Sequence, residues 1–355
     1  MYNSYDNFLS CFILTLLSQK MPFMSDIDER PDLSEIFDLY FHGKYHFNDF
    51  THLTIENEIS IIEFNKRVFY SPSKKLKDIH VFLTLALFEN CEINQEIAFA
   101  YRKGVSIIQA VEKHKDNNVF FKTDIKSFFK NITIDLVEDV ILENKDKLLF
   151  SNIEIYIKNI LNLITYKNEI PIGFSTSPII SNIVLKKLDD LLSKDANQND
   201  YVVTRYSDDI ISSTNNNSID LKKILLERLE HIFKTEYNNN FTINTKKSKL
   251  LKKGNKIKML GMVILPNGKI SVDKKIKNNV EISLFNFINK PENFISVVNS
   301  LTTKNNKKNK EECLKYLSGQ INYINSIDSS YINKLRKKYG SNTIDMLVYR
   351  TKGLF

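Results

Sequence analysis

The chain has 355 residues, a hydrophobic content of 42%, a charged content of 26% and a formal net charge of +8. This composition excludes a chain dominated by disorder and allows two or three subdomains with sizeable cores. The three cysteines form neither a metal-ligand spacing nor an even disulfide set, which predicts reduced thiols in a cytoplasmic protein. The basic excess fits a polyanionic partner, and a Lys-rich surface with no such partner explains the charge alone equally well.

The first apolar stretch is Phe8–Leu17. It resembles the apolar part of a signal peptide, but Asp6 precedes it, no basic residue does, and no clear cleavage site follows. The stretch is also too short to span a bilayer. We therefore expect a buried or amphipathic helix and no membrane association, followed by mixed helical structure to about residue 65.

The segment from Arg67 to His80 begins like a strand, passes Pro72 and turns basic, and an apolar helical pattern follows. Further on, Arg102-Lys103-Gly104 forms a predicted turn before another helix. Basic groups at a loop tip suit phosphate contacts, and the forked guanidinium of arginine matches phosphate geometry. An ordinary solvated loop is the alternative for this segment alone.

Asn118–Asp124 has the pattern of a buried strand that ends in a carboxylate. Such an aspartate is either a catalytic ligand at a sheet edge or the N-cap of the helix predicted to follow. Within that helix, Phe128 and Phe129 face different sides, so one can enter the core while the other lines a pocket. The next chemical signal is Pro171-x-Gly173, a turn leading into a helix with Pro178 near its first position.

Tyr201–Thr214 predicts a β-hairpin, because two β-prone runs flank a short polar tip. The tip carries Asp208 and Asp209, whose adjacent like charges are costly unless a cation neutralises them. Carboxylate oxygens in such a place suit Mg²⁺, whereas an acidic turn without a metal is the simpler alternative. The other pair, Asp189-Asp190, lies in a helical pattern beside lysines, and we expect it on a solvated face.

A clear amphipathic helix is predicted over Ile219–Phe233, and a cationic patch that includes Lys247 follows. Lys258–Ile264 predicts one short strand containing a glycine. The rest of the chain, from Val280 onward, has a helical pattern with a Lys/Asn-rich interruption, which suits contact with a nucleic-acid backbone.

The order of these features resembles the palm of reverse transcriptases over roughly residues 66–265. Arg67-x₄-Pro72, the segment Ala100–Ser106 and the segment Gly319–Ile327 further resemble the finger, Arg-x-Gly and thumb motifs of the bacterial branch, which includes retron, group II intron and defence-associated enzymes. The resemblance implies an α+β fold, a right-hand polymerase with fingers, an antiparallel palm sheet and a helical thumb. The expected domains are an N-terminal helical extension (1–55), fingers (56–117), palm (118–265) and thumb-like region (266–355).

The resemblance also implies roles for individual residues. Two Mg²⁺ ions would be held by Asp124, Asp208, Asp209 and the Ile125 carbonyl. Lys247 is the candidate proton donor to pyrophosphate, and Phe129 is the candidate steric gate against a ribose 2′-hydroxyl. The remaining candidates for substrate binding are Arg67, Lys75, Arg102, Gly173 and Tyr206.

Some positions depart from the family pattern. Ile172 stands where many members have Gln, Ser207 where Ala is frequent, and Met259-Leu260-Gly261 replaces the Val-Thr-Gly typical of retron enzymes. We therefore expect a stand-alone, abortive-infection-type reverse transcriptase that adds dNTPs to a primer on an RNA template and serves antiviral defence. The alternatives are a retron enzyme that copies a dedicated non-coding RNA, template-independent or protein-primed DNA synthesis, and an RNA-binding scaffold without activity. An oligomer is compatible with the sequence.

Overall fold

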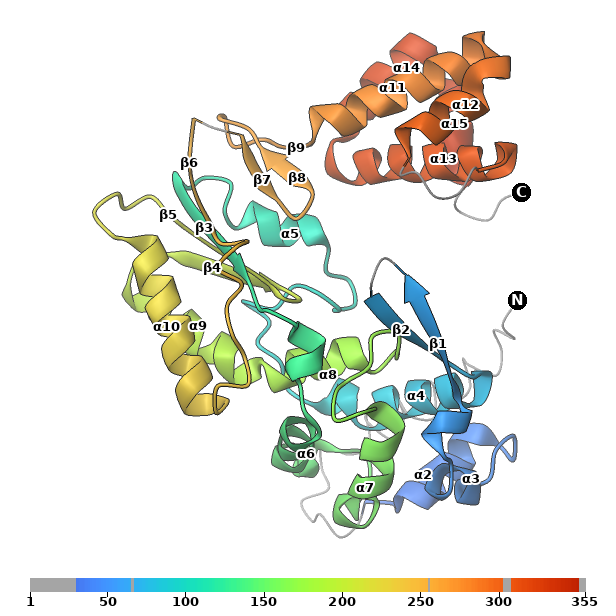
Figure 1. Cartoon of the computed structure of the whole chain (residues 1–355), viewed down its shortest axis with the longest axis vertical. Coiled ribbons are helices and arrows are strands. Elements are labelled where there is room, and N and C mark those ends of the chain that lie inside the picture. The colour runs from blue at the N-terminus through green and yellow to red at the C-terminus, as the bar shows by residue number, and fades with distance from the viewer. Residues whose placement is uncertain (1–29, 65–66, 255, 303–307, 351–355) are drawn as a thin grey trace. The chain divides into compact units, whose positions relative to one another are not determined.

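The computed structural model describes residues 30–64, 67–254, 256–302 and 308–350. The helix expected over Phe8–Leu17 lies outside these residues. The chain divides into two compact units. The first unit comprises Met1–Ser106 and Phe120–Leu250, and the second comprises Ile107–Val119 and Leu251–Phe355. Figure 1 labels the elements of both. None of the helices in the described part of the chain is long and apolar enough to cross a membrane.

The helices of the first unit surround an aromatic and aliphatic core. Asp32 and Glu35 form a capping box at the start of α2 (Leu33–Phe41). The ring centroid of Phe37 lies within 6 Å of the ring centroids of Phe41, Phe50 and Phe82. The α-helices of this unit are α2 Leu33–Phe41, α3 Phe47–Thr51, α4 Lys74–Ala86, α6 Ile134–Glu143, α7 Ile153–Ile164, α8 Ser177–Val184, α9 Lys186–Gln198 and α10 Leu221–Glu236.

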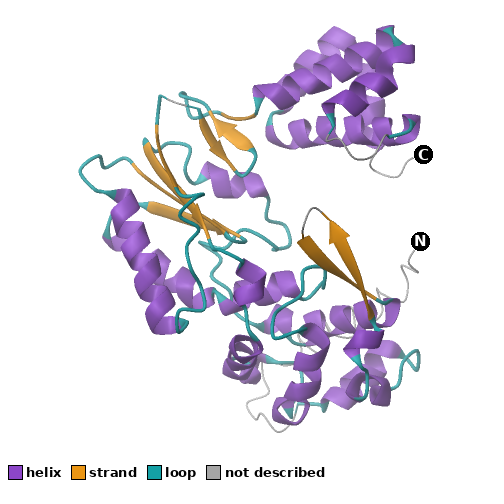
Figure 2. Cartoon of the chain, viewed as in Figure 1, coloured by secondary structure: helices purple, strands orange, loops and turns teal. Residues whose placement is uncertain are grey.

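Two sheets accompany these helices, as the orange strands of Figure 2 show. The smaller sheet is an antiparallel hairpin of β1 (Ile59–Phe64) and β2 (Arg67–Pro72). The larger has the order β4-β5-β3-β6. Its strands are β3 Val119–Asp124, β4 Val202–Tyr206, β5 Asp209–Thr214 and β6 Lys249–Lys252.

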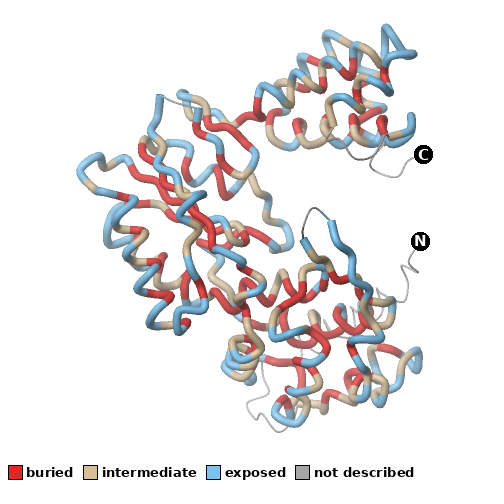
Figure 3. The backbone as a smooth tube through the Cα atoms, viewed as in Figure 1, coloured by how far each residue is buried: buried red, intermediate tan, exposed pale blue. Residues whose placement is uncertain are grey.

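The larger sheet carries the residues of interest at the ends of buried strands. Every residue of β3 except Lys122 is buried, and every residue of β5 after Asp209 is buried. Helix α9 packs against β4 and α10 against β5, which accounts for the red strands and helix faces in Figure 3. The rigid packing of these strands therefore determines where the polar residues at their ends lie.

The second unit contains a small sheet and a helical bundle. The expected single strand over Lys258–Ile264 is wrong: Leu260 and Gly261 adopt positive φ values of 46° and 82° and make a tight turn. The chain therefore forms two strands of an antiparallel sheet, β7 Ile257–Met259 and β8 Met262–Ile264, which β9 Ile270–Val272 completes. The helices are α5 Ile107–Glu112, α11 Lys274–Asn289, α12 Pro291–Leu301, α13 Lys310–Ile327, α14 Ser329–Tyr339 and α15 Ser341–Arg350.

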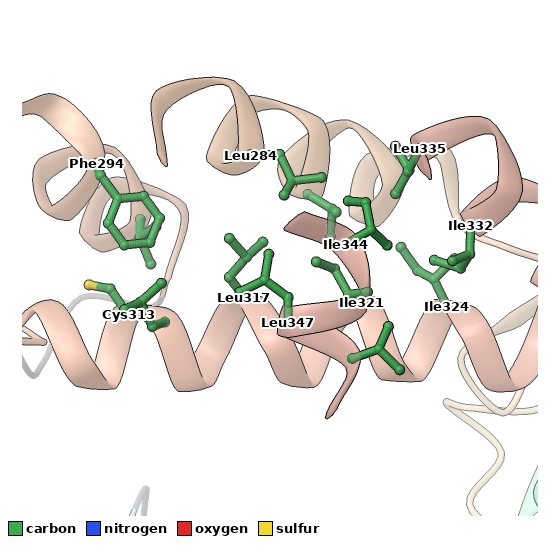
Figure 4. Close-up of a cluster of buried hydrophobic side chains, with 14 of the residues drawn as sticks. Leu284, Phe294, Cys313, Leu317, Ile321, Ile324, Ile332, Leu335, Ile344 and Leu347 are labelled. Carbon is green, nitrogen blue, oxygen red and sulfur yellow. The ribbon is translucent and has the colours of Figure 1, made fainter. Parts of the chain in front are cut away.

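The helical bundle has its own hydrophobic core. Figure 4 shows Leu317 and Ile321 of α13 facing Leu284 of α11 and Leu347 of α15. These side chains are almost completely removed from solvent. Each such burial stabilises the fold by roughly 1.5–3 kcal/mol before conformational entropy is subtracted.

Candidate active site

The Asp208-Asp209 hairpin forms as the sequence predicts. Strands β4 and β5 pair with Tyr206 opposite Asp209, which leaves Ser207 and Asp208 as a two-residue turn. Ser207 has φ +60°, a left-handed conformation that costs a non-glycine residue about 1 kcal/mol or more. Tyr206 is half-buried, and Asp208 lies at the tip of the turn.

Asp124 ends β3, the strand next to β5 in the sheet. The amide of Ile125 donates a hydrogen bond to the carbonyl of Asp208 at 3.0 Å, so the two aspartates lie on adjacent backbone segments. The Asp124 side chain is 4% exposed. Its Oδ2 accepts a bond from Lys247 Nζ at 2.9 Å and a longer one from Asn244 Nδ2 at 3.4 Å.

Electrostatics connect these carboxylates. The desolvation of Asp209, then the negative charges of Asp208 and Asp124, raise the pKa of its carboxyl, although the residue as a whole is exposed. The hydrogen bond to Asp124 raises the pKa of Lys247 and keeps its amine protonated. The structure thus brings together Asp124, Ile125, Asp208, Asp209 and Lys247, which are separated by up to 123 positions in the sequence.

The carboxylates fit a divalent cation in chemistry, although they do not form a closed cage. Asp124 Oδ1 is buried and has no hydrogen-bond partner in the structure, which is costly unless a cation or another donor approaches it. Mutual repulsion of the three aspartates favours the same kind of ligand. Within the described ranges, no three acidic, histidine or cysteine side chains stand in a ready-made metal-binding arrangement.

The two consecutive phenylalanines occupy different environments. Phe128 is buried and lies 6.3 Å, ring to ring, from Phe241. Phe129 is half-buried beside it. Both belong to a short 3-10 helix over Phe128–Asn131, and the continuous helix expected from Ile125 is wrong, because Ser127 adopts φ +50° before it. The steric-gate role of Phe129 stays a prediction.

Gly173 lies against strand β2 of the β1–β2 hairpin. Its φ is +114°, and a Cβ atom there would stand 2.2 Å from the carbonyl oxygen of Tyr70. The amide of Tyr70 donates to the carbonyl of Ile172 at 2.8 Å. The turn and the strand therefore approach more closely than any residue with a side chain allows.

The predicted phosphate-binding cations have other partners in this structure. Lys75 pairs with Asp49 at 2.8 Å, and Arg102 donates to the carbonyls of Gln95 and Ala98 at 2.8 and 2.7 Å. Burial lowers the pKa of Arg102. Arg67 is exposed at the start of β2. The substrate contacts of these three residues stay predictions.

The expectation that Asp189 lies on a solvated face is wrong. Its side chain is fully buried and accepts two hydrogen bonds from Arg205, at 2.8 and 2.6 Å. Burial raises the pKa of Asp189, and the guanidinium opposes that rise. Sequence reasoning also missed Arg205, for which the available signal was a charged residue within an apolar strand pattern.

Comparison with known proteins identifies the family. Residues 64–264, more than half of the chain, match the family described as reverse transcriptase (RNA-dependent DNA polymerase). The chain therefore belongs to the reverse transcriptase family, and it is an RNA-directed DNA polymerase. The predicted family and the predicted α+β polymerase fold are both confirmed.

Several bacterial retron reverse transcriptases are similar to this chain. The chain is 29% identical to the retron Ec73 reverse transcriptase of Escherichia coli over 283 residues, which cover 77% of this chain and 83% of that protein. It is 24% identical to the retron Ec83 reverse transcriptase of the same species over 296 residues, 81% and 87% of the two chains. The retron Mx162 reverse transcriptase of Myxococcus xanthus is 24% identical over 61% of this chain and 48% of its own.

Solved structures give a weaker likeness. A telomerase from Candida albicans aligns with 84% of this chain and 61% of its own length, with a TM-score of 0.44 and 14% identity. A foamy viral protease-reverse transcriptase aligns with 76% of this chain and 43% of its own, with a TM-score of 0.37 and 17% identity.

Proposed function

We propose that this protein is a retron-type reverse transcriptase that adds dNTPs to a primer with two Mg²⁺ ions held by Asp124, Asp208 and Asp209. The observation that carries the proposal is the junction of β3 with the β4–β5 hairpin. There, an unpartnered buried carboxylate oxygen of Asp124 lies beside the backbone segment that carries Asp208. The retron relatives support the retron alternative, although Met259-Leu260-Gly261 departs from the Val-Thr-Gly typical of retron enzymes.

The residues of the chain would divide the work as follows. Asp124 and Asp208, joined by Asp209 and the Ile125 carbonyl, would hold the metal ions. When bound, the ions lower the pKa of the primer 3′-hydroxyl and neutralise charge on the phosphates. Lys247, kept protonated by Asp124, would give its proton to the leaving pyrophosphate.

Substrate selection would rest on two other residues. The half-buried ring of Phe129 would exclude a ribose 2′-hydroxyl, and Gly173 would let the backbone approach the nascent base pair. Arg67 would contact phosphates from its exposed position, and Lys75 and Arg102 would do so after exchanging their present partners. The partners would be an RNA template, a primer, dNTPs and a dedicated structured RNA.

The buried free thiols of Cys91 and Cys313 support a reducing, cytoplasmic setting. Antiviral defence is proposed from the family resemblance alone.

The test is incorporation of radiolabelled dNTPs by the purified full chain with Mg²⁺, with its co-purified nucleic acid retained or digested by RNase. Asp208→Ala is the site variant, and Asp139→Ala, which removes an exposed carboxylate from the middle of α6, is the matched control. We expect RNase-sensitive incorporation that Asp208→Ala abolishes and Asp139→Ala retains. Sequencing the product identifies the template.

Other outcomes would point elsewhere. Incorporation that resists RNase but needs Asp208 would favour untemplated or protein-primed synthesis. Incorporation that survives Asp208→Ala would refute the assignment of the metal site. A protein that binds RNA and incorporates nothing would favour the scaffold alternative.

A further inference from the structure

Among the residues that the structure describes, Arg205 in β4 has the largest side chain buried without solvent contact, and its partner Asp189, in α9, is equally buried. The guanidinium meets the carboxylate through two bonds, at 2.8 and 2.6 Å. A buried ion pair is weak evidence for stability, because removing two charges from water costs about as much as their attraction returns. The pair therefore calls for an explanation in terms of what the guanidinium holds.

The remaining donor group of Arg205 is directed to the turn formed by Ser207 and Asp208. Its Nη1 donates to the carbonyl of Ser207 at 3.1 Å and to Oδ1 of Asn182 at 3.1 Å. Asn182 in turn donates to the carbonyl of Ala100 at 2.8 Å. Ser207 is the residue that precedes Asp208, so the buried guanidinium is bonded to the peptide unit that carries this candidate metal ligand.

A second hydrogen bond joins the side chain of Ser207 to that of Tyr101. The hydroxyl of Tyr101 lies 2.9 Å from Oγ of Ser207. Tyr101 and Ser207 both have φ +60°, a backbone conformation that residues other than glycine, asparagine and aspartate rarely adopt. Strained residues persist where surrounding contacts over-determine them, and here the contacts are mutual.

The segment that carries Tyr101 is itself joined to β4. The amide of Phe99 donates to the carbonyl of Arg205 at 2.9 Å, and the amide of Arg205 donates to the carbonyl of Ile97 at 2.7 Å. Tyr101 therefore stands on a backbone that is hydrogen-bonded to the strand leading into the turn. The bond to Ser207 exists because this chain has a hydroxyl where alanine would offer none.

We propose that Arg205 and Tyr101 are positioning residues for Asp208. Arg205 binds the carbonyl of Ser207, and Tyr101 binds its hydroxyl. Together they hold Ser207 in the left-handed conformation that orients the Asp208 carboxylate. The proposal rests on the proposed metal-dependent function of the site. Asp189 and Asn182 keep the guanidinium in place through their hydrogen bonds to it. The competing explanation is that the network only stabilises the fold.

The two explanations are separated by Tyr101→Phe, which deletes one oxygen from a side chain that is 45% exposed as a residue. Tyr156→Phe is the matched control, since its hydroxyl donates to Asp32, at 3.1 and 3.3 Å, and not to a residue of the Ser207-Asp208 turn. Three quantities are measured on the full chain freed of nucleic acid: the melting temperature without divalent cation, Mn²⁺ affinity by electron paramagnetic resonance, and kcat and KM for dNTP with Mg²⁺ and added template-primer.

We expect Tyr101→Phe to lower kcat and to weaken Mn²⁺ binding by roughly twofold to tenfold, the value of one hydrogen bond, while KM and the melting temperature stay at the control values. Ser207→Ala should have the same effect, and the double variant should be no worse than either single one, because both remove the same bond. Arg205→Lys, which retains the charge but loses the fork, should weaken Mn²⁺ binding further, by roughly tenfold to a hundredfold.

Additive effects in the double variant, or a Tyr101→Phe protein that matches Tyr156→Phe in kcat and Mn²⁺ affinity, would overturn the positioning role. A lower melting temperature with unchanged Mn²⁺ affinity would likewise leave only a structural role. Asp208→Ala separates this failure from that of the proposed function. If Asp208→Ala itself leaves Mn²⁺ affinity unchanged, the metal site is wrong, whereas a loss there with no loss in Tyr101→Phe refutes the positioning inference alone.

Discussion

Replacing Gly173 with alanine tests the close contact between the Pro171–Phe174 turn and strand β2. The new Cβ would stand 2.2 Å from the carbonyl oxygen of Tyr70, a distance that no real contact shows, and the neighbouring atom is backbone rather than a flexible side-chain end. The φ of +114° adds a conformational penalty. The turn and the strand must therefore separate.

The magnitude follows from three contributions. The positive φ costs alanine about 1–2 kcal/mol. Overpacking costs about 1–3 kcal/mol. The hydrogen bond from the Tyr70 amide to the Ile172 carbonyl, 2.8 Å long, is weakened at a cost of about 1 kcal/mol. We expect Gly173→Ala to lower the free energy of unfolding by about 3–6 kcal/mol in total, which corresponds to a melting temperature lower by roughly 6–24 °C.

Gly43→Ala is the matched control. Gly43 has φ +79° in the same unit, and a Cβ there would meet nothing within 4 Å, so only the conformational penalty remains. The assay is urea unfolding together with hydrogen exchange of the Tyr70 amide. If Gly173→Ala destabilises the protein no more than Gly43→Ala, and the Tyr70 amide exchanges at its original rate, the reasoning about this contact is refuted.

Two further predictions address the nucleotide site and acid stability. Phe129→Ala should raise NTP incorporation relative to dNTP incorporation by roughly tenfold, because a half-buried ring no longer blocks the 2′-hydroxyl. Primer extension measures this ratio, with Phe128→Leu, a variant of the buried neighbour, as the control. If Phe129→Ala excludes NTPs as strongly as Phe128→Leu does, the gate is contradicted. Burial lowers the pKa of His80 to about 4 from an ordinary 6.5, so the unfolded chain binds a proton that the folded chain refuses as the pH falls from about 7 to 4. The free energy of unfolding should therefore fall by about 3 kcal/mol more over that range in the unmodified chain than in His80→Gln. Urea unfolding at both pH values tests this, and parallel loss in the two proteins would show that His80 is protonated in the fold.

Much of the candidate site was predictable because its signals are local. The two β-prone runs on either side of Ser207-Asp208 predicted the hairpin, and the buried pattern ending at Asp124 predicted the strand that carries the other aspartate. The 3.6-residue pattern predicted α10 to within three residues at either end. These features depend on neighbours in the chain, which a sequence displays directly.

Contacts between distant segments were decided only by the tertiary structure. Asp189 and Asp190 have the same chemistry and adjacent positions, yet one is buried against Arg205 and the other pairs with Lys186. Helical periodicity places two adjacent residues on different faces but does not say which face meets β4.

The same limit applies to Gly173 and Leu260. The need for glycine at position 173 comes from the carbonyl of Tyr70, about a hundred positions earlier in the chain, and the sequence alone shows only a turn. Leu260 adopts a left-handed conformation that its own preferences oppose, because the pairing of β7 with β8 requires the turn. Local preference is worth about 1 kcal/mol in each case, and packing contributes several times that amount, so packing prevails.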